Sequence, residues 1–182
     1  MKSDNNTIEF GETEKRLQLL YQITSQPKKD LNDQLDNALE LTTKLLGMEI
    51  GIISSISKES MTYTIRNFFP EDSGLSVGQT FDLGNTYCSI TLESDDVVAI
   101  NHMKESAYER HPCYNTFSLE AYIGIPIIIN RELYGTINFS SPNPKKGGFV
   151  PSDFTLMKLL SEWVAATIKR ARIVKALKEK NE

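Results

Sequence analysis

The sequence predicts a single α+β domain in which helices from both chain ends pack on one face of a mainly antiparallel sheet. Apolar residues recur at helical spacing before and after a central region of short strand-like segments. Those segments are joined by hairpins, which makes neighbouring strands antiparallel. No linker or internal repeat divides the 182 residues, a length typical of one domain with terminal extensions.

Two helices are expected before the sheet. The first ten residues are polar and are expected to fray, and a helix then runs from residue 12 to about residue 26. Pro27-Lys28-Lys29 ends it, and a second helix covers residues 30–46, with Gly47 placed as its C-cap. The predicted apolar side of the first helix consists of Leu17, Leu20, Tyr21 and Thr24.

Strand signals follow, because Ile-rich and alternating segments are bounded by turn residues. The patterns predict strands at residues 49–57 and 62–69, joined by a hairpin loop at 58–60. A third strand at 77–83, a short helix at 84–92 and a fourth strand at 97–101 follow.

The second half of the chain predicts an irregular segment and then the clearest hairpin. Residues 106–118 are expected to be irregular, since Pro112 restricts the backbone in their middle. The apolar run 119–129 and the alternating run 133–140 are joined by Asn130-Arg131-Glu132, which predicts a turn.

A final helix is expected after residue 151. Ser152 is its expected N-cap, and Asp153 is well placed in its first turn. Its sheet-facing residues are predicted to be Phe154, Met157, Leu160, Val164, Thr167 and Ile168. A weaker stripe at Ala171, Val174 and Leu177 extends beyond what one small sheet covers, which favours a helical pair with a second chain.

Composition limits the function classes. The chain carries 20 Lys and Arg against 24 Asp and Glu, and a net charge of -4 argues against nucleic acid as the main partner. No apolar stretch approaches the length of a membrane span, and the first residues lack the core of a signal peptide. Two cysteines are too few for a disulfide framework, so we expect a cytoplasmic protein with no membrane partner.

Several motifs, taken in order, resemble a GAF domain of the type found with bacterial sensor histidine kinases and related signalling proteins. They are 84–88 (GNTYC), 106–114, 119–126 (LEAYIGIP), 133–139 (LYGTINF) and Trp163-Val164. The resemblance implies a six-stranded antiparallel sheet, with N- and C-terminal helices on one face and a pocket on the other under residues 84–117. It also divides the chain into an N-terminal extension and helix (1–29), a GAF domain (30–168) and a C-terminal helical extension (169–182).

The favoured function is a non-catalytic sensory or regulatory domain that binds a small molecule or partner. The resemblance implies a homodimer through the terminal helices and an output domain, such as a histidine kinase of a two-component system. The candidate ligand-binding residues are Cys88, Asn101, Tyr108, His111, Cys113, Tyr114, Phe117, Glu120, Tyr122 and Asn138. The alternative is a purely structural dimerisation module with a filled pocket, in which the aromatic side chains of this set only cover the sheet.

A thiol enzyme is the alternative from another class. A thiol becomes nucleophilic where a cationic neighbour lowers its pKa, and Cys113 follows His111 closely. The pair of cysteines is similar to that of GAF enzymes that reduce free methionine sulfoxide. By that resemblance Cys113 is the nucleophile, Cys88 the resolving thiol and Glu120 an acid that contacts substrate. Tyr114 departs from the pattern, because those enzymes carry an acidic residue after the nucleophile.

Three further ligand classes are weaker. The photosensory GAF domains that this chain resembles attach a bilin covalently through a Cys-His pair. In His111-Pro112-Cys113 the order is reversed. Metal binding has one close pair, His111 and Cys113, with His102 and Cys88 further away, whereas structural zinc sites usually show two such pairs. A cyclic nucleotide needs a polar pocket, which Asn101, Tyr108, Tyr114, Tyr122 and Asn138 are candidates to line. No metal or identified cofactor is therefore expected.

Overall fold

The computed structural model describes residues 2–26 and 30–181. Its helices are α1 (Lys2–Thr24), α2 (Leu31–Leu46), α3 (Tyr87–Thr91), α4 (Pro112–Phe117) and α5 (Pro151–Lys180). Its strands are β1 (Ile50–Ser57), β2 (Thr62–Phe69), β3 (Thr80–Asp82), β4 (Val98–Ile100), β5 (Ala121–Ile129) and β6 (Glu132–Ser141). Three short 3-10 turns complete the chain: η1 (Glu71–Ser73), η2 (Leu83–Asn85) and η3 (Met103–Glu105).

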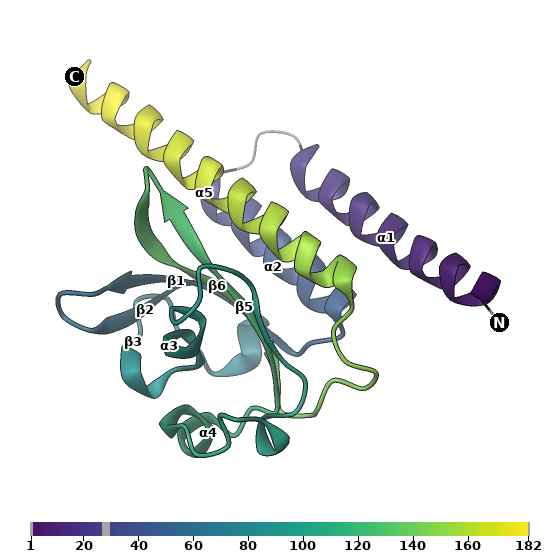
Figure 1. Cartoon of the computed structure of the whole chain (residues 1–182). Helices are drawn as coiled ribbons and strands as arrows, with labels where there is room; N and C mark the ends of the chain where they lie inside the picture. Colours follow the sequence, from purple (N-terminus) through teal and green to yellow (C-terminus); the bar gives the residue numbers. More distant parts are fainter. Residues whose placement is uncertain (1, 27–29, 182) are drawn as a thin grey trace.

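The six strands form one antiparallel sheet in the order β3-β2-β1-β6-β5-β4. Helices α1, α2 and α5 lie together on one side of it, whereas α3, α4 and their connections lie on the other (Figure 1). The predicted α+β fold class is confirmed. This arrangement leaves the two ends of the chain on the side opposite to the residues that connect β2 with β5.

The main core fills the space between the sheet and the terminal helices. It joins Leu39 of α2 and Leu160 of α5 to Ile123 and Phe139 of the sheet, all of them fully buried. Strand β5 reads as a continuous apolar run because nearly every residue is buried, on one face by α5 and on the other by α3.

Helix ends explain two of the boundaries. The Asp30 side chain accepts a hydrogen bond from the Asp33 N–H, and Gly47 ends α2 in the left-handed conformation, as predicted. Helix α5 begins one residue before the predicted cap. Pro151 occupies its first position, where a missing N–H costs nothing, and the Asp153 carboxylate accepts the Val150 N–H at 2.9 Å.

Helix α1 differs from its prediction in extent and in its buried side. The helix begins at Lys2, within the segment expected to fray. Leu19 and Ile23 enter the core, while Leu17 and Tyr21 remain 59% and 72% exposed. Two apolar stripes run along this helix, and of the four predicted residues Leu20 alone packs against the core.

Two other segments also differ. The region predicted to be irregular contains helix α4, whose N-cap is the His111 ring accepting the Cys113 N–H at 3.2 Å. Strand β3 is shorter than expected, because Gly78 adopts a positive φ and turns the chain before Thr80. Val77, once placed in that strand, is exposed in this turn.

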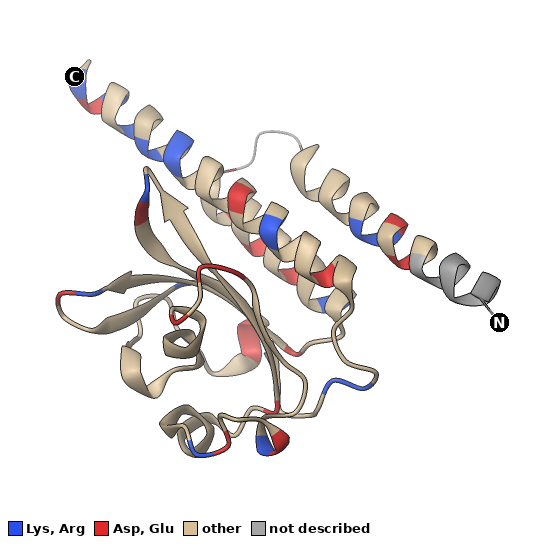
Figure 2. Ribbon diagram, in the orientation of Figure 1, with Lys and Arg blue, Asp and Glu red and all other residues tan. Residues whose placement is uncertain are grey.

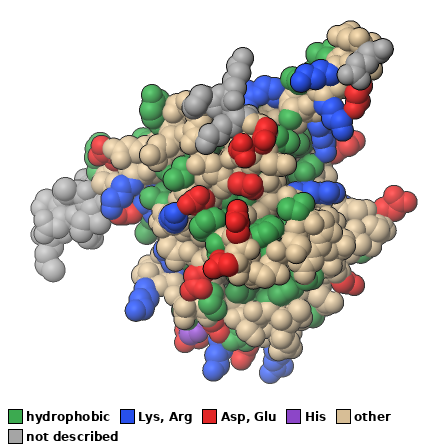
Figure 3. Space-filling view, turned by 180° about the vertical axis from the view of Figure 1, so that it is seen from behind, with side chains coloured by type: hydrophobic (Ala, Val, Ile, Leu, Met, Phe, Trp, Pro, Cys, Tyr) green, Lys and Arg blue, Asp and Glu red, His purple; other side chains and the backbone are tan. Residues whose placement is uncertain are grey.

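Charge is distributed unevenly over the surface. Basic side chains predominate along the last turns of α5 (Figure 2). Acidic side chains gather near the middle of the face seen from behind, with hydrophobic side chains between them (Figure 3). On α2, burial raises the pKa of Asp36, and the nearby charges of Asp33, Asp30 and Glu71 add to the shift. Neither surface belongs to the cavity described below.

Candidate functional site

A cavity of about 230 Å³ lies on the side of the sheet opposite to the terminal helices. Its floor is formed by β1, β2, β5 and β6, and its walls by η1, β3, α3 and the end of α4. The lining residues are Ile50, Ile52, Tyr63, Ile65, Ser73, Leu75, Phe81, Thr86, Tyr87, Cys88, Phe117, Leu119, Tyr122, Asn138 and Ser140.

Five aromatic rings surround the cavity and contact one another in a chain. Tyr87 stacks on Tyr122 with ring centroids 5.4 Å apart, and Phe117 meets Phe81 edge to face at 5.6 Å. Tyr63 lies 6.1 Å from Phe81. These separations are those of favourable aromatic pairs, so the rings form a stiff wall of the cavity.

The thiol of Cys88 lies at the centre of a buried polar network below these rings. Its sulfur is 3.0 Å from Thr136 Oγ1 and 3.6 Å from the Tyr122 hydroxyl, and it accepts the Asn138 amide N–H at 3.3 Å. The Tyr122 hydroxyl is also 2.6 Å from Thr91 Oγ1. Burial raises the pKa of Cys88, and the hydrogen bonds from Thr136 and Tyr122 offset only part of that shift. The network therefore holds a neutral thiol.

Gly124 makes room for this network. A Cβ at this position would lie 2.4 Å from the Tyr122 hydroxyl oxygen and 3.0 Å from Thr91 Oγ1. The Tyr122 side chain therefore folds back over Gly124 along its own strand and leaves the cavity open.

The structure brings four of the ten predicted ligand residues to the cavity and places six elsewhere. Cys88, Phe117, Tyr122 and Asn138 line it. The six that lie outside it are Asn101, Tyr108, His111, Cys113, Tyr114 and Glu120.

Two of these six hold connecting segments in place. Asn101 is exposed, and its side-chain oxygen accepts the Phe149 N–H at 3.0 Å, which orders the loop before α5. The Nε2 atom of His111 lies 3.2 Å from Ser89 Oγ, so this ring joins α4 to α3. Tyr108 packs beside the cluster of Met103 and Cys113 and does not line the cavity.

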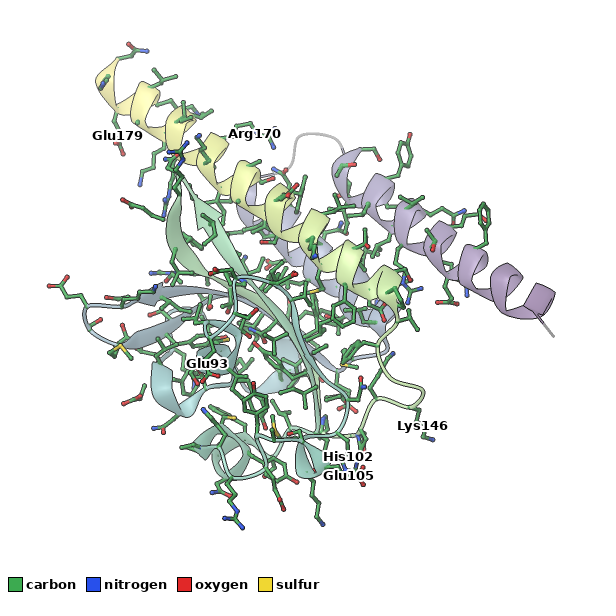
Figure 4. The ribbon with its side chains drawn as sticks, in the orientation of Figure 1. Glu93, His102, Glu105, Lys146, Arg170 and Glu179 are labelled. Atoms are coloured by element: carbon green, nitrogen blue, oxygen red, sulfur yellow. The ribbon has the colours of Figure 1, made fainter. Side chains whose placement is uncertain are left out.

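Tyr114 and Glu120 belong to a polar cluster near η3. The Tyr114 hydroxyl donates to Glu120, whose other oxygen accepts the Lys104 N–H and lies 3.5 Å from His102 Nε2. Burial opposes ionisation of Glu120, yet the hydrogen bond from Tyr114 and the charge of His102 leave its pKa below the usual value. His102 also pairs with Glu105, beside which it projects from the molecule (Figure 4). This cluster stabilises the connection between β4 and β5.

Cys113 is fully buried and does not contact the cavity. It packs with Tyr87, Met103 and Tyr122 in a core cluster, and burial raises its pKa to about 12. A nucleophilic thiol needs the opposite shift, so the environment of Cys113 keeps it protonated and unreactive.

We expect both thiols to resist alkylation while the protein is folded. Iodoacetamide at neutral pH should leave Cys88 and Cys113 unmodified, and both should react in urea. Because the pKa of Cys113 is raised from 9.0 to about 12, the folded state loses stability relative to the unfolded state as the pH rises through this range. Urea unfolding across that range should therefore show a shallower loss for Cys113→Ala than for wild type. Rapid native labelling of Cys113 would contradict this assignment.

Sequence reasoning missed most of the apolar lining. Ile50, Ile52 and Ile65 read as ordinary core, Tyr63 and Phe81 carried no motif, and Tyr87 lay in the 84–88 motif but was not chosen as a ligand residue. A signal was present in β1 and β6, where alternate residues face the cavity. Asn138 and Ser140 follow this alternation on β6, as Ile50 and Ile52 do on β1.

The cavity lacks charged groups. No Asp, Glu, Lys, Arg or His is found among the lining residues within the described part of the chain. The described residues also contain no group of three or more His, Cys, Asp or Glu side chains arranged to hold a metal ion. Nor is any described helix both long and apolar enough to cross a bilayer.

A family model for the GAF domain matches residues 30–168. The chain belongs to the GAF domain family. GAF domains generally bind small molecules in signalling, and the cavity lies within the matched residues. No curated protein matches this GAF domain significantly.

Solved structures of other GAF domains share its fold. A GAF domain from a phosphoenolpyruvate-protein phosphotransferase of Coxiella burnetii has a TM-score of 0.71 at 20% identity, covering 90% of this chain and 98% of that one. The corresponding Acinetobacter domain has a TM-score of 0.68 at 15% identity, covering 91% and 97%. Free methionine-R-sulfoxide reductase from Neisseria meningitidis has a TM-score of 0.66 at 12% identity, covering 87% and 89%. At these identities the likeness is one of fold.

Proposed function

We propose that this GAF domain is a non-catalytic sensory domain that binds a small molecule in the cavity and signals through α1 and α5. The observation that carries the proposal is the placement of the cavity and the terminal helices on opposite faces of the same strands. Residues 30–168 would then form the sensory domain, with 1–29 and 169–182 as extensions towards a partner. The two free, buried cysteines support a reducing cytoplasmic setting.

Strands β5 and β6 connect the two faces. Tyr122 and Asn138 face the cavity from these strands, while the Ser161 hydroxyl of α5 donates to the Pro126 carbonyl at 2.7 Å. Further along, the guanidinium of Arg172 lies over the Tyr134 ring of β6, 5.1 Å from its centroid. A ligand that favours one position of these strands would shift the population of α5 arrangements by no more than its differential affinity.

Exposed apolar side chains on both terminal helices support a homodimer. On α1 these are Phe10, Leu17 and Tyr21, and on α5 they are Leu159, Ile173 and the predicted stripe residues Val174 and Leu177. Leu159, Ala166 and Ile173 lie seven residues apart, and Leu177 follows Ile173 by four residues, which is the spacing of a coiled-coil seam. Leu17 and Leu159 line one groove between the helices, so the two stripes are continuous. A second copy would cover this surface and extend α5 towards an output domain such as a histidine kinase.

The thiol-enzyme alternative lacks support from geometry. Cys113 is outside the cavity and Glu120 is bound to Tyr114, so neither is placed to meet a substrate beside Cys88. Methionine sulfoxide turnover should be absent in wild type and in Cys113→Ser alike, and turnover that the substitution abolishes would restore the enzyme hypothesis.

The dimer is tested by adding charge to the stripe. We expect wild type to elute as a dimer in size-exclusion chromatography with light scattering, and Ile173→Glu combined with Leu177→Glu to elute as a monomer. Lys175→Glu is the matched control, because it adds a carboxylate to the same helix away from the stripe. A wild-type monomer, or a dimer that survives the double substitution, would contradict this part of the proposal. Native mass spectrometry of the same samples reports any bound small molecule.

A further inference from the structure

Two polar side chains on the cavity floor retain unused hydrogen-bonding capacity. Asn138 and Ser140 are 4% and 2% exposed, and both line the cavity. The Asn138 amide nitrogen donates to Cys88 Sγ, but its oxygen accepts no hydrogen bond from any described residue. The Ser140 hydroxyl likewise has none among the residues described. Both side chains line the same cavity, where a ligand can supply the missing hydrogen-bond partners.

The two side chains are placed to act together. They are two residues apart on β6, so they lie on the same face of the sheet, roughly 6.5 Å apart along the strand. Their neighbours across the sheet are apolar or aromatic: Ile52 beside Asn138, and Ile50 and Tyr122 beside Ser140. The Asn138 oxygen and the Ser140 hydroxyl therefore lie on the floor beside apolar and aromatic side chains.

Size and shape restrict the ligand further. A cavity of about 150 Å³ lined by apolar groups holds one benzene ring. The present cavity of about 230 Å³ is half as large again, which matches a fused bicyclic ring. The aromatic wall of Tyr87, Tyr122 and Phe117 favours a flat ligand, and the lack of charged lining residues disfavours a carboxylate, a phosphate or an ammonium group.

We infer that the cavity binds an uncharged, flat, bicyclic heterocycle that carries a cyclic amide or an equivalent donor-acceptor edge. The ligand N–H donates to the Asn138 oxygen, and the Ser140 hydroxyl donates to the ligand carbonyl. This inference rests on the proposed sensory function and adds the chemical class that the cavity selects.

Three probes of similar size test this inference on the full chain. They are isoquinolin-1-one, which has the cyclic amide, naphthalene, which has only the hydrocarbon rings, and 1-naphthoate, which adds a charge. We expect isoquinolin-1-one to bind at least tenfold more tightly than naphthalene, because two hydrogen bonds to buried groups are gained. We expect no measurable binding of 1-naphthoate. Ligand-observed NMR titration measures all three.

Substitutions then test which side chains bind the cyclic amide of the probe. Ser140→Ala should weaken isoquinolin-1-one binding about fivefold and leave naphthalene binding unchanged. Ser141→Ala is the matched control, since Ser141 is the next residue on β6 and its hydroxyl oxygen accepts the Asn143 N–H instead. Asn138→Leu should weaken the amide probe and strengthen naphthalene binding, a reversal that simple loss of folding does not produce.

The outcomes separate this inference from the function on which it rests. Equal binding of naphthalene and isoquinolin-1-one, unaffected by Ser140→Ala, overturns the donor-acceptor edge but leaves a ligand-binding cavity. Preferred binding of 1-naphthoate overturns the uncharged class in the same way. Failure of all three probes to bind a folded sample overturns the inference alone, because a cavity that binds a ligand of another class remains.

Discussion

Replacing Gly135 with alanine is expected to destabilise the domain by more than about 3 kcal/mol. Gly135 pairs with Ser55 on β1 and with Ile127 on β5, in the middle of the sheet. A Cβ at this position would lie 1.8 Å from the Ser54 carbonyl oxygen and 2.8 Å from the Ser55 Cα. These are backbone atoms, so relief requires the two central strands to move apart rather than a side chain to rotate.

The measurement is thermal unfolding followed by circular dichroism, with an expected fall in melting temperature of roughly 6–12 °C. Gly11→Ala is the control, because a Cβ at Gly11 meets nothing within 4 Å and the residue lies within α1. This control should be neutral or stabilising by up to about 1 kcal/mol, the ordinary gain in helix propensity. A melting temperature for Gly135→Ala close to that of wild type would show that β1 and β6 separate readily at this point.

The succession of strands along the chain was predictable because local patterns and turn signals agree along most of the chain. The turn at Asn130 and Arg131 has positive φ at both residues, as a two-residue hairpin loop requires, and the predicted flanking runs are β5 and β6. The buried side of α1 was not predictable in this way. Leu17 and Tyr21 form a hydrophobic stripe, as Leu19 and Ile23 do, and periodicity does not distinguish a core from a surface left for a partner.

The site was harder to predict because chemically capable side chains drew attention away from the cavity. Cys113, His111 and Glu120 lie in one short segment of sequence, but each side chain is already packed against or hydrogen-bonded to neighbouring residues. The cavity instead takes its surface from strand residues distant in sequence, such as Ile52 and Ser140, which meet only when the sheet forms. Helix α4 was missed for a local reason, since its cap is a histidine and the favoured N-caps are Ser, Thr, Asp and Asn.

Replacing Arg16 with methionine is the second change expected to have a large effect, about 3–5 kcal/mol of destabilisation. Arg16 of α1 donates from Nε and Nη2 to one oxygen of Asp153 at 3.0 and 2.6 Å, and both residues are buried. The other Asp153 oxygen accepts the Val150 N–H at the start of α5. Removal of Arg16 leaves a buried carboxylate without its cation, and the helix start that it caps loses support.

A double-mutant cycle in urea separates the ion pair from simple loss of packing. Adding Asp153→Asn to Arg16→Met should recover part of the loss, because no unpaired charge then remains buried, whereas two independent sites would show additive losses. Arg16→Lys should be intermediate, since an ammonium keeps the charge but lacks the planar fork. This pair ties α1 to α5 below the groove that Leu17 and Leu159 share. We therefore expect Arg16→Met also to weaken dimerisation, although Arg16 is not one of the stripe residues. An unchanged dimer dissociation constant would show that α1 keeps its position without the ion pair.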